Sequence, residues 1–323
     1  MDKAGRKRLI RLAGWTTAIV VILFVGRKVG ADLRDLAQQP MPAHPVWGFI
    51  ALSGILFLLA HAVLVQTWRA VLGCWEKPMP FWSAARVWSV SNLGKYVPGK
   101  IWQIGAMSAM SRELGVSPIV ASAAAILGAI VNVIAGFVLA ILCGRVLLDR
   151  AQPGWGTLAT VIVAISLVGL ALAPFLVPRL APLIARLAGR RLETTLPVRA
   201  VVYSLAGNVV AWLIYGAAFE LLVIGLLGSA SGGYPAYLAA YTISYLFGYL
   251  AFFAPAGAGV RELFMLQVLE GVGLATPQAA LVTIVSRVWL TLLEVTPALL
   301  FWAHHRMRRR TTTIDSPDVP NRP

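Results

Sequence analysis

Long apolar stretches separated by short polar intervals dominate the chain. A helix needs about 20 mostly apolar residues to cross the hydrocarbon core of a bilayer. Six stretches meet this requirement, so we expect an all-α polytopic membrane protein. The predicted spans cover residues 9–26, 46–68, 118–142, 155–177, 199–227 and 277–303.

Two segments break this pattern, over roughly 81–112 and 236–273. Each places proline, glycine and charge together where the surrounding sequence is typical of membrane spans. A bilayer tolerates a broken helix only where its backbone is buried in protein or lines a cavity. The residues predicted to break these helices are Pro98, Gly99, Pro255, Gly257 and Gly259.

Two topologies fit the interrupted segments. In the first, each segment is a re-entrant helical hairpin that enters and leaves by one face of the membrane. The two hairpins then form an inverted pair, an arrangement that many secondary transporters build around a midplane binding site. In the second, the helices of each segment cross fully, which raises the number of spans to between eight and ten.

The order of these elements predicts a single transmembrane domain, residues 1–306, with two inverted-repeat-like halves. The halves cover about 46–142 and 199–303, and each contains one interrupted segment. Residues 307–323 have no hydrophobic periodicity and are predicted to form a disordered cytoplasmic tail.

Composition and charge agree with this class and orient the chain. The sequence is 59% hydrophobic and 13% charged, with a formal net charge of +15. The basic residues lie beside the predicted spans, so they indicate a positive-inside signal and do not predict nucleic-acid binding. Of the 28 Lys and Arg residues, 21 fall on one side of the predicted topology. We therefore expect a multi-pass protein of the plasma (inner) membrane with both termini in the cytoplasm.

No arrangement of residues predicts catalysis, a cofactor or a metal site. The chain has no Ser/His/Asp set and no Gly-rich phosphate loop after a strand, and its cysteines, Cys74 and Cys143, form no CxxC pair. The alternative is a polytopic glycosyltransferase that uses Asp32 or Asp35 in the first outer loop as base or metal ligand. We expect no enzymatic activity.

The candidate substrate-binding residues are the charged and amide side chains of the interrupted segments and of the last span. Arg261 and Glu262 fall in the first turn of a new helix, where freed backbone N–H groups and a guanidinium suit phosphate. Glu262 is expected to pair with Arg287 or Lys100, or to cap that helix. Arg287 and Glu294 lie two turns apart on one helix face. The complete set is Asn92, Lys100, Gln103, Arg261, Glu262, Arg287 and Glu294.

Two motifs carry a resemblance to a known family. Gly-Lys-Tyr-Val-Pro-Gly-Lys-Ile-Trp over 94–102 and Pro-Ala-Gly-Ala-Gly-Val-Arg-Glu over 255–262 resemble the signatures of the lysylphosphatidylglycerol synthase transmembrane-region family. In the first motif Asn92 and Pro98 fit the family pattern, whereas Lys100 replaces an arginine and Gln103 a glutamate. The resemblance implies that the chain is similar to the flippase-like membrane part of the multiple peptide resistance factor.

This resemblance implies lipid translocation and not lipid synthesis. Family synthases carry a soluble aminoacyltransferase domain after the membrane region, and none is expected in the 17 residues that follow Arg306. The expected function is flippase-like transport of an anionic phospholipid or a polyprenyl-phosphate-linked glycolipid, with membrane lipids as partners. The alternative is a non-catalytic membrane partner of a glycosyltransferase or cell-envelope assembly. The sequence does not determine the oligomeric state.

Overall fold

The computed structural model describes residues 45–96, 101–151, 154–188, 196–251 and 254–314. Every regular element in this part of the chain is a helix, which confirms the all-α prediction. The described residues form nine α-helices and the two one-turn segments η1 and η2. In chain order they are α2 (Trp47–Leu72), α3 (Phe81–Asn92), η1 (Leu93–Tyr96), α4 (Ile101–Arg112), α5 (Pro118–Ala151), α6 (Trp155–Ala188), α7 (Val198–Leu227), α8 (Gly233–Leu250), η2 (Pro255–Gly257), α9 (Val260–Val272) and α10 (Thr276–Ile314).

Five of the described helices are long and apolar enough to cross a membrane. They are α2, α5, α6, α7 and α10, and they coincide with the last five predicted spans. The first predicted span, 9–26, lies outside the described residues. The chain is therefore a multi-pass membrane protein.

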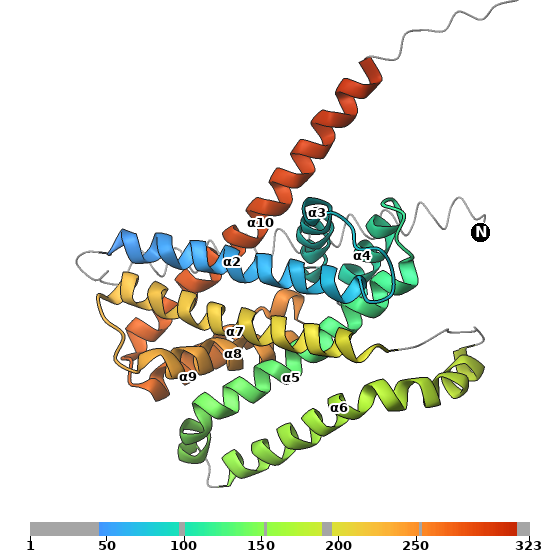
Figure 1. Ribbon diagram of the computed structural model, residues 1–323. Helices are drawn as coiled ribbons and strands as arrows, with labels where there is room; N and C mark the ends of the chain where they lie inside the picture. Colours follow the sequence, from blue (N-terminus) through green and yellow to red (C-terminus); the bar gives the residue numbers. More distant parts are fainter. Residues whose placement is uncertain (1–44, 97–100, 152–153, 189–195, 252–253, 315–323) are drawn as a thin grey trace, which may run out of the picture.

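Helices α2 and α7 form an antiparallel pair along their whole length (Figure 1). At one end the backbone N–H of Val46 donates to the carbonyl of Gly225 at 2.8 Å. At the other end Arg199 Nη2 donates to the carbonyl of Cys74 at 2.9 Å. Hydrogen bonds at both ends hold the register of the pair.

Glycines allow α2 and α7 to approach closely. A Cβ atom on Gly207 would lie 1.8 Å from Thr67 Oγ1, and one on Gly225 would lie 2.6 Å from the Ile50 side chain. Small residues at helix contacts are how membrane helices gain van der Waals contact, because lipid supplies no hydrophobic driving force for their association. These two glycines therefore set the spacing on which the rest of the bundle is built.

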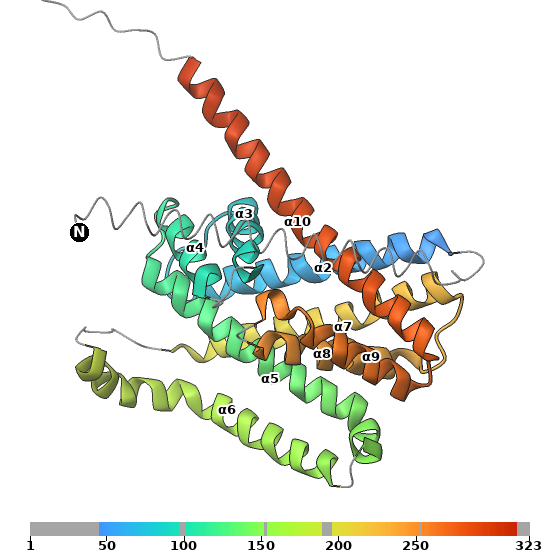
Figure 2. The ribbon, with the colours of Figure 1, turned by 180° about the vertical axis from the view of Figure 1, so that it is seen from behind.

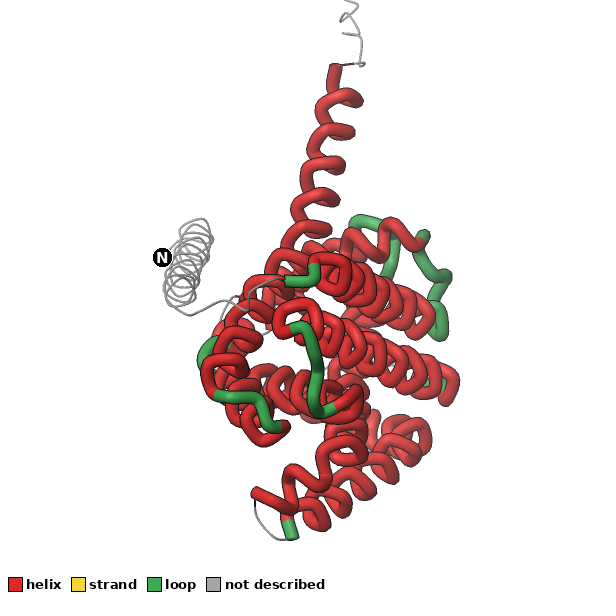
Figure 3. The backbone as a smooth tube through the Cα atoms, turned by 90° about the vertical axis from the view of Figure 1, so that its left-hand side faces the viewer, coloured by secondary structure: helices red, strands yellow, loops and turns green. Residues whose placement is uncertain are grey.

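The remaining long helices surround this pair. Helix α5 crosses beside α7 and α8, whereas α6 lies at the edge of the bundle against α5 (Figures 1 and 2). Figure 3 shows the bundle from one end, with the last part of α10 projecting away from it.

Helix α10 corrects the predicted domain boundary at its C-terminal end. The prediction placed a disordered tail over 307–323, but α10 continues to Ile314 and passes through Pro297 without ending. Residues 307–314 contain neither proline nor glycine, so nothing in their sequence ends the helix. Residues 315–323 lie outside the described part of the chain.

The two interrupted segments are helix–turn–helix hairpins. The first consists of α3, η1 and α4, and the second of α8, η2 and α9. Helices α3 and α4 have 12 residues each and α9 has 13, which at 1.5 Å per residue is about 18–20 Å. The hydrocarbon core is about 30 Å thick, so none of the three matches its thickness. The turns η1 and η2 contact each other inside the bundle.

The turn of the second hairpin depends on backbone that favours glycine. Ala256, Gly257 and Gly259 have φ angles of 48°, 72° and 87°. A Cβ on Gly257 would lie 2.6 Å from the Cα of Gly248 in α8, so the η2 turn packs against α8 almost backbone to backbone. The predicted breaking residues of this segment, Pro255, Gly257 and Gly259, all lie in this turn or at the start of α9.

Candidate functional site

A cavity of about 320 Å³ lies where the two hairpins meet α2, α5, α7 and α10. This volume is at the lower end of the range for ligand sites in proteins. Five predicted site residues line it, and they come from both hairpins and from the last span. They are Asn92, Gln103, Arg261, Arg287 and Glu294.

Arg261 lies in the first turn of α9 and is 8% exposed. Its guanidinium carbon is 5.3 Å from the ring centroid of Tyr241 and 5.2 Å from that of Tyr245, so two aromatic faces support the charge. Its Nη2 atom has no hydrogen-bond partner among the described residues. A buried donor without a partner costs free energy, and a charged one costs more. The cavity therefore presents an unused cationic donor.

Glu262 both caps α9 and pairs with α10. Its Oε2 accepts a hydrogen bond of 2.6 Å from the backbone N–H of Gly259, and its Oε1 lies 3.1 Å from Arg287 Nε. Arg287 also donates from Nη2 to the carbonyl of Ala256 at 2.9 Å. Two of the alternatives from the sequence, capping and pairing with Arg287, are thus both present. Arg287 holds the turn of the second hairpin through a carboxylate and a backbone oxygen.

Glu294 makes the corresponding contact with the first hairpin. Its Oε2 lies 2.5 Å from Lys95 Nζ and accepts a hydrogen bond of 3.2 Å from the Tyr96 hydroxyl. Lys95 and Tyr96 both belong to η1. Helix α10 therefore carries an arginine that binds one hairpin turn and a glutamate that binds the other.

The amide residues of the first hairpin contact each other. Gln103 Nε2 lies 3.4 Å from Asn92 Oδ1, which links the end of α3 to the start of α4. Three other predicted residues, Pro98, Gly99 and Lys100, lie outside the described residues.

Sequence reasoning missed two features of the cavity. Lys95 is absent from the set of predicted site residues, but it is a charged partner within the site. The second feature is a row of tyrosines on α8, Tyr237, Tyr241, Tyr245 and Tyr249, in which Tyr241, Tyr245 and Tyr249 line the cavity. Their four-residue spacing places them on one helix face, and that spacing is visible in the sequence.

The electrostatics of the site favour an anion. In the described part of the site, Lys95, Arg261 and Arg287 carry three positive charges, and Glu262 and Glu294 carry two negative charges. Both carboxylates have cationic partners, so Arg261 supplies the remaining positive charge. No group of three His, Cys, Asp or Glu side chains is placed to bind a metal ion in the described part of the chain.

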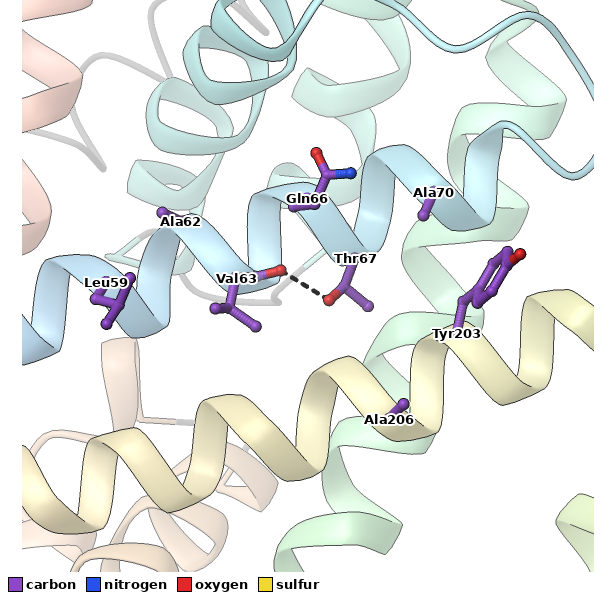
Figure 4. A pocket seen from close by; sticks show the side chains of 8 residues that line it. All are labelled: Leu59, Ala62, Val63, Gln66, Thr67, Ala70, Tyr203 and Ala206. Carbon is purple, nitrogen blue, oxygen red and sulfur yellow. Dashed lines mark hydrogen bonds between the residues drawn. The ribbon is translucent and has the colours of Figure 1, made fainter.

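A second hollow lies on the outer face between α2 and α7 and differs in character. It is an apolar groove that includes the exposed side chains of Leu59 and Tyr203 (Figure 4). The one hydrogen bond drawn there runs from Thr67 Oγ1 to the carbonyl of Val63, 2.7 Å away in the same helix. The groove suits contact with lipid chains, whereas the charged chemistry belongs to the inner cavity.

Comparison with known proteins supports the resemblance carried by the two motifs. The family described as the lysylphosphatidylglycerol synthase TM region matches residues 11–297, which include both hairpins and the cavity. None of the curated proteins or solved structures compared matches the chain.

Proposed function

Because the chain belongs to the lysylphosphatidylglycerol synthase transmembrane-region family, we propose that it is a flippase-like transporter of a lipid with an anionic headgroup. The substrate is an anionic phospholipid or a polyprenyl-phosphate-linked glycolipid. The observation that carries the proposal is the buried guanidinium of Arg261, whose Nη2 has no partner in the described residues of a cavity formed by both hairpins.

Phosphate fits this position for two physical reasons. The planar guanidinium presents N–H donors in a fork that matches two phosphate oxygens, and such charge-assisted bonds are strong away from water. Arg261 also lies at the start of α9, where free backbone N–H groups and the helix dipole attract negative charge.

The two ion pairs explain how the site is maintained without substrate. Lys95 and Arg287 are held by Glu294 and Glu262, so the empty cavity contains no group of uncompensated cations. A phosphate near Arg261 competes with these carboxylates for the same cations. Binding and release then exchange one set of charge contacts for another, and release of the headgroup costs little.

The arrangement of the helices supports transport over simple binding. Short helices that meet at η1 and η2 fit re-entrant hairpins, because broken backbone is stable in a membrane only when protein or a cavity covers it. Each half has the order span, hairpin, span, and α2 runs antiparallel to α7 (Figure 1). This order is expected of inverted repeats around a midplane site.

The proposed location is the plasma membrane with both termini in the cytoplasm. The support is the distribution of Lys and Arg, since basic residues accumulate on the cytoplasmic side of membrane proteins. In this orientation the first hairpin enters from the cytoplasm and the second from the opposite face.

A second candidate function is a non-catalytic membrane partner of a glycosyltransferase or cell-envelope enzyme. Helix α6 favours it, because this helix lies at the edge of the bundle and most of its apolar side chains are exposed. Such a face can contact another membrane protein or lipid. This function predicts a stable complex and no sensitivity to substitutions in the cavity.

Native mass spectrometry of the detergent-extracted protein tests the primary proposal. We expect one class of phosphate-bearing lipid to be enriched on the wild type and lost from Arg261→Gln. The matched control is Arg179→Gln, which removes an exposed arginine that donates a hydrogen bond to the carbonyl of Phe175 in its own helix. If wild type and Arg261→Gln retain the same lipids in the same proportions, the binding site is wrong and the partner function gains support.

Movement of a fluorescent phospholipid between leaflets of reconstituted vesicles tests transport itself. Wild type and Arg179→Gln should accelerate it equally, and Arg261→Gln should not. Arg261→Lys keeps the charge but removes the fork, so an intermediate rate is expected. A rate unchanged in Arg261→Gln contradicts the proposed transport.

A further inference from the structure

A second group of polar side chains faces the same cavity from α5 and α7. Asn132 Nδ2 donates to Asn208 Oδ1 at 2.9 Å, and Asn208 Nδ2 donates to the carbonyl of Ser204 at 2.7 Å. Asn132, Asn208 and Ser204 all line the cavity. Neither asparagine is among the predicted site residues, and their hydrogen bond also joins α5 to α7.

These hydrogen bonds leave part of the asparagine chemistry unused. An amide has two N–H donors and a carbonyl oxygen with two lone pairs. Among the described residues, the side-chain bonds of Asn132 use one of its donors, so its Oδ1 and second N–H remain for a ligand. A group that both donates and accepts at adjacent positions is suited to the hydroxyls of a polyol.

An aromatic layer connects this amide pair to Arg261. Trp212 Nε1 donates to the backbone carbonyl of Asn132 at 3.0 Å, and the Trp212 ring centroid lies 5.3 Å from that of Tyr245. The guanidinium of Arg261 lies 5.2 Å from the same tyrosine ring. The amide pair and the guanidinium thus border one aromatic layer, and a single headgroup can contact both.

The charges of the cavity also restrict the chemistry of the headgroup beyond its phosphate. Glu294 is paired with Lys95, and Glu262 with Arg287. Among the described residues, an ammonium group entering the cavity would therefore meet Arg261 and two further cations without a carboxylate of its own. The amide pair of Asn132 and Asn208 is neutral, so a neutral group can bind it without a carboxylate.

From these contacts we propose that the headgroup is a phosphate joined to a neutral polyol, either glycerol or a sugar. The phosphate binds Arg261 and the hydroxyls bind Asn132 and Asn208. An aminoacylated headgroup, which carries ammonium groups, is disfavoured. This inference rests on the proposed function and specifies its substrate class.

Competition among four lipids in nanodiscs, followed by native mass spectrometry, tests the inference. The lipids are phosphatidylglycerol, a polyprenyl phosphoglucose, phosphatidic acid and phosphatidylethanolamine in equal amounts. We expect wild type to retain at least one polyol lipid over phosphatidic acid by about threefold to tenfold, the range that one net hydrogen bond provides. Phosphatidylethanolamine should be retained least. Which of the two polyol lipids is favoured shows whether the headgroup polyol is glycerol or a sugar.

Two variants separate this inference from the proposed function. Asn132→Leu should reduce retention of the polyol lipid to that of phosphatidic acid, whereas Arg261→Gln should reduce retention of every phosphate lipid. Asn132→Ser, which shortens the side chain with less apolar change, should give the same result if Asn132→Leu does not fold. The control is Gln66→Leu, which removes an amide from the outer groove.

Several results overturn the inference. Retention of phosphatidic acid or phosphatidylethanolamine equal to that of both polyol lipids rejects the polyol site while leaving the phosphate site intact. An unchanged polyol preference in folded Asn132→Leu or Asn132→Ser does the same. If wild type enriches none of the four lipids, both the inference and the proposed phosphate site fail.

Discussion

Lys95 Nζ lies 2.5 Å from Glu294 Oε2, although 199 positions separate the two residues in the chain. Lys95 belongs to the turn of the first hairpin and Glu294 to the last described span, so this ion pair joins the two halves at the cavity. Both side chains are largely buried, with 17% and 13% of their surface exposed. The contact makes the position of the first hairpin depend on α10.

Glu294→Gln should destabilise the protein by about 3–5 kcal/mol, because it leaves the Lys95 ammonium buried without a counterion. The double variant Lys95→Met/Glu294→Leu removes both charges and should recover most of this loss. Thermal unfolding in detergent, followed by size-exclusion chromatography, measures the difference. A double variant that is less stable than Glu294→Gln would show that the pair contributes something other than charge compensation.

Gly207→Leu should separate α2 from α7 and lower stability by about 1–3 kcal/mol or more, because a Cβ at this position already overlaps the Thr67 side chain. All three nearest atoms belong to Thr67, so Thr67→Gly in the same chain should restore part of the loss. Gly169→Leu on α6 is the control, since nothing lies within 4 Å of a Cβ there. Equal melting temperatures for Gly207→Leu and Gly169→Leu would contradict this packing.

Gly248→Ala should reduce lipid retention through Arg261. A Cβ on Gly248 would lie 2.8 Å from the Cβ of Arg261, so the arginine must shift in its position against the tyrosines. The control in the same hairpin is Gly271→Ala, where a Cβ meets nothing within 4 Å. We expect retention of the phosphate lipid to fall several-fold in Gly248→Ala and to stay at the wild-type level in Gly271→Ala. Similar retention in both variants would show that the close contact between Gly248 and Arg261 does not position Arg261 for lipid binding.

Thiol labelling tests the re-entrant topology in a chain that lacks Cys74 and Cys143. If the first hairpin is re-entrant, Val97→Cys should react with a membrane-impermeant reagent from the same side as Lys77→Cys, which lies before α3. Ala256→Cys should react from the opposite side, together with Ser231→Cys before α8. Labelling of Val97→Cys from the side opposite Lys77→Cys would mean that the first hairpin crosses the membrane fully.

Local sequence was sufficient for most elements of the bundle. The last five predicted spans correspond to long apolar helices, and the Pro-Gly breaks fall at the turn of the second hairpin. The end of α10 differs from the prediction because its basic residues were interpreted as a tail, although residues 307–314 contain neither proline nor glycine. Basic residues are compatible with a helix, so charge alone could not identify the boundary.

The candidate site was predicted in its residue types but not in its contacts. The sequence predicted that Arg261, Arg287 and Glu294 act together, and all three line one cavity. It did not indicate that Glu294 pairs with Lys95, or that tyrosines on α8 support Arg261. A four-residue spacing of tyrosines indicates that they share one helix face, but it does not predict which helix packs against that face.

By itself, the sequence determined the class of protein, the long helices, the interruptions and the family, because length, hydropathy and helix breaking act over neighbouring residues. The tertiary structure decided that the two hairpin turns meet, that Lys95 and Glu294 neutralise each other, and that Arg261 Nη2 has no hydrogen-bond partner in the described part of the chain. These contacts join residues far apart in the chain. They depend on how closely glycines such as Gly207 and Gly248 let the helices approach, and no local pattern specifies that distance.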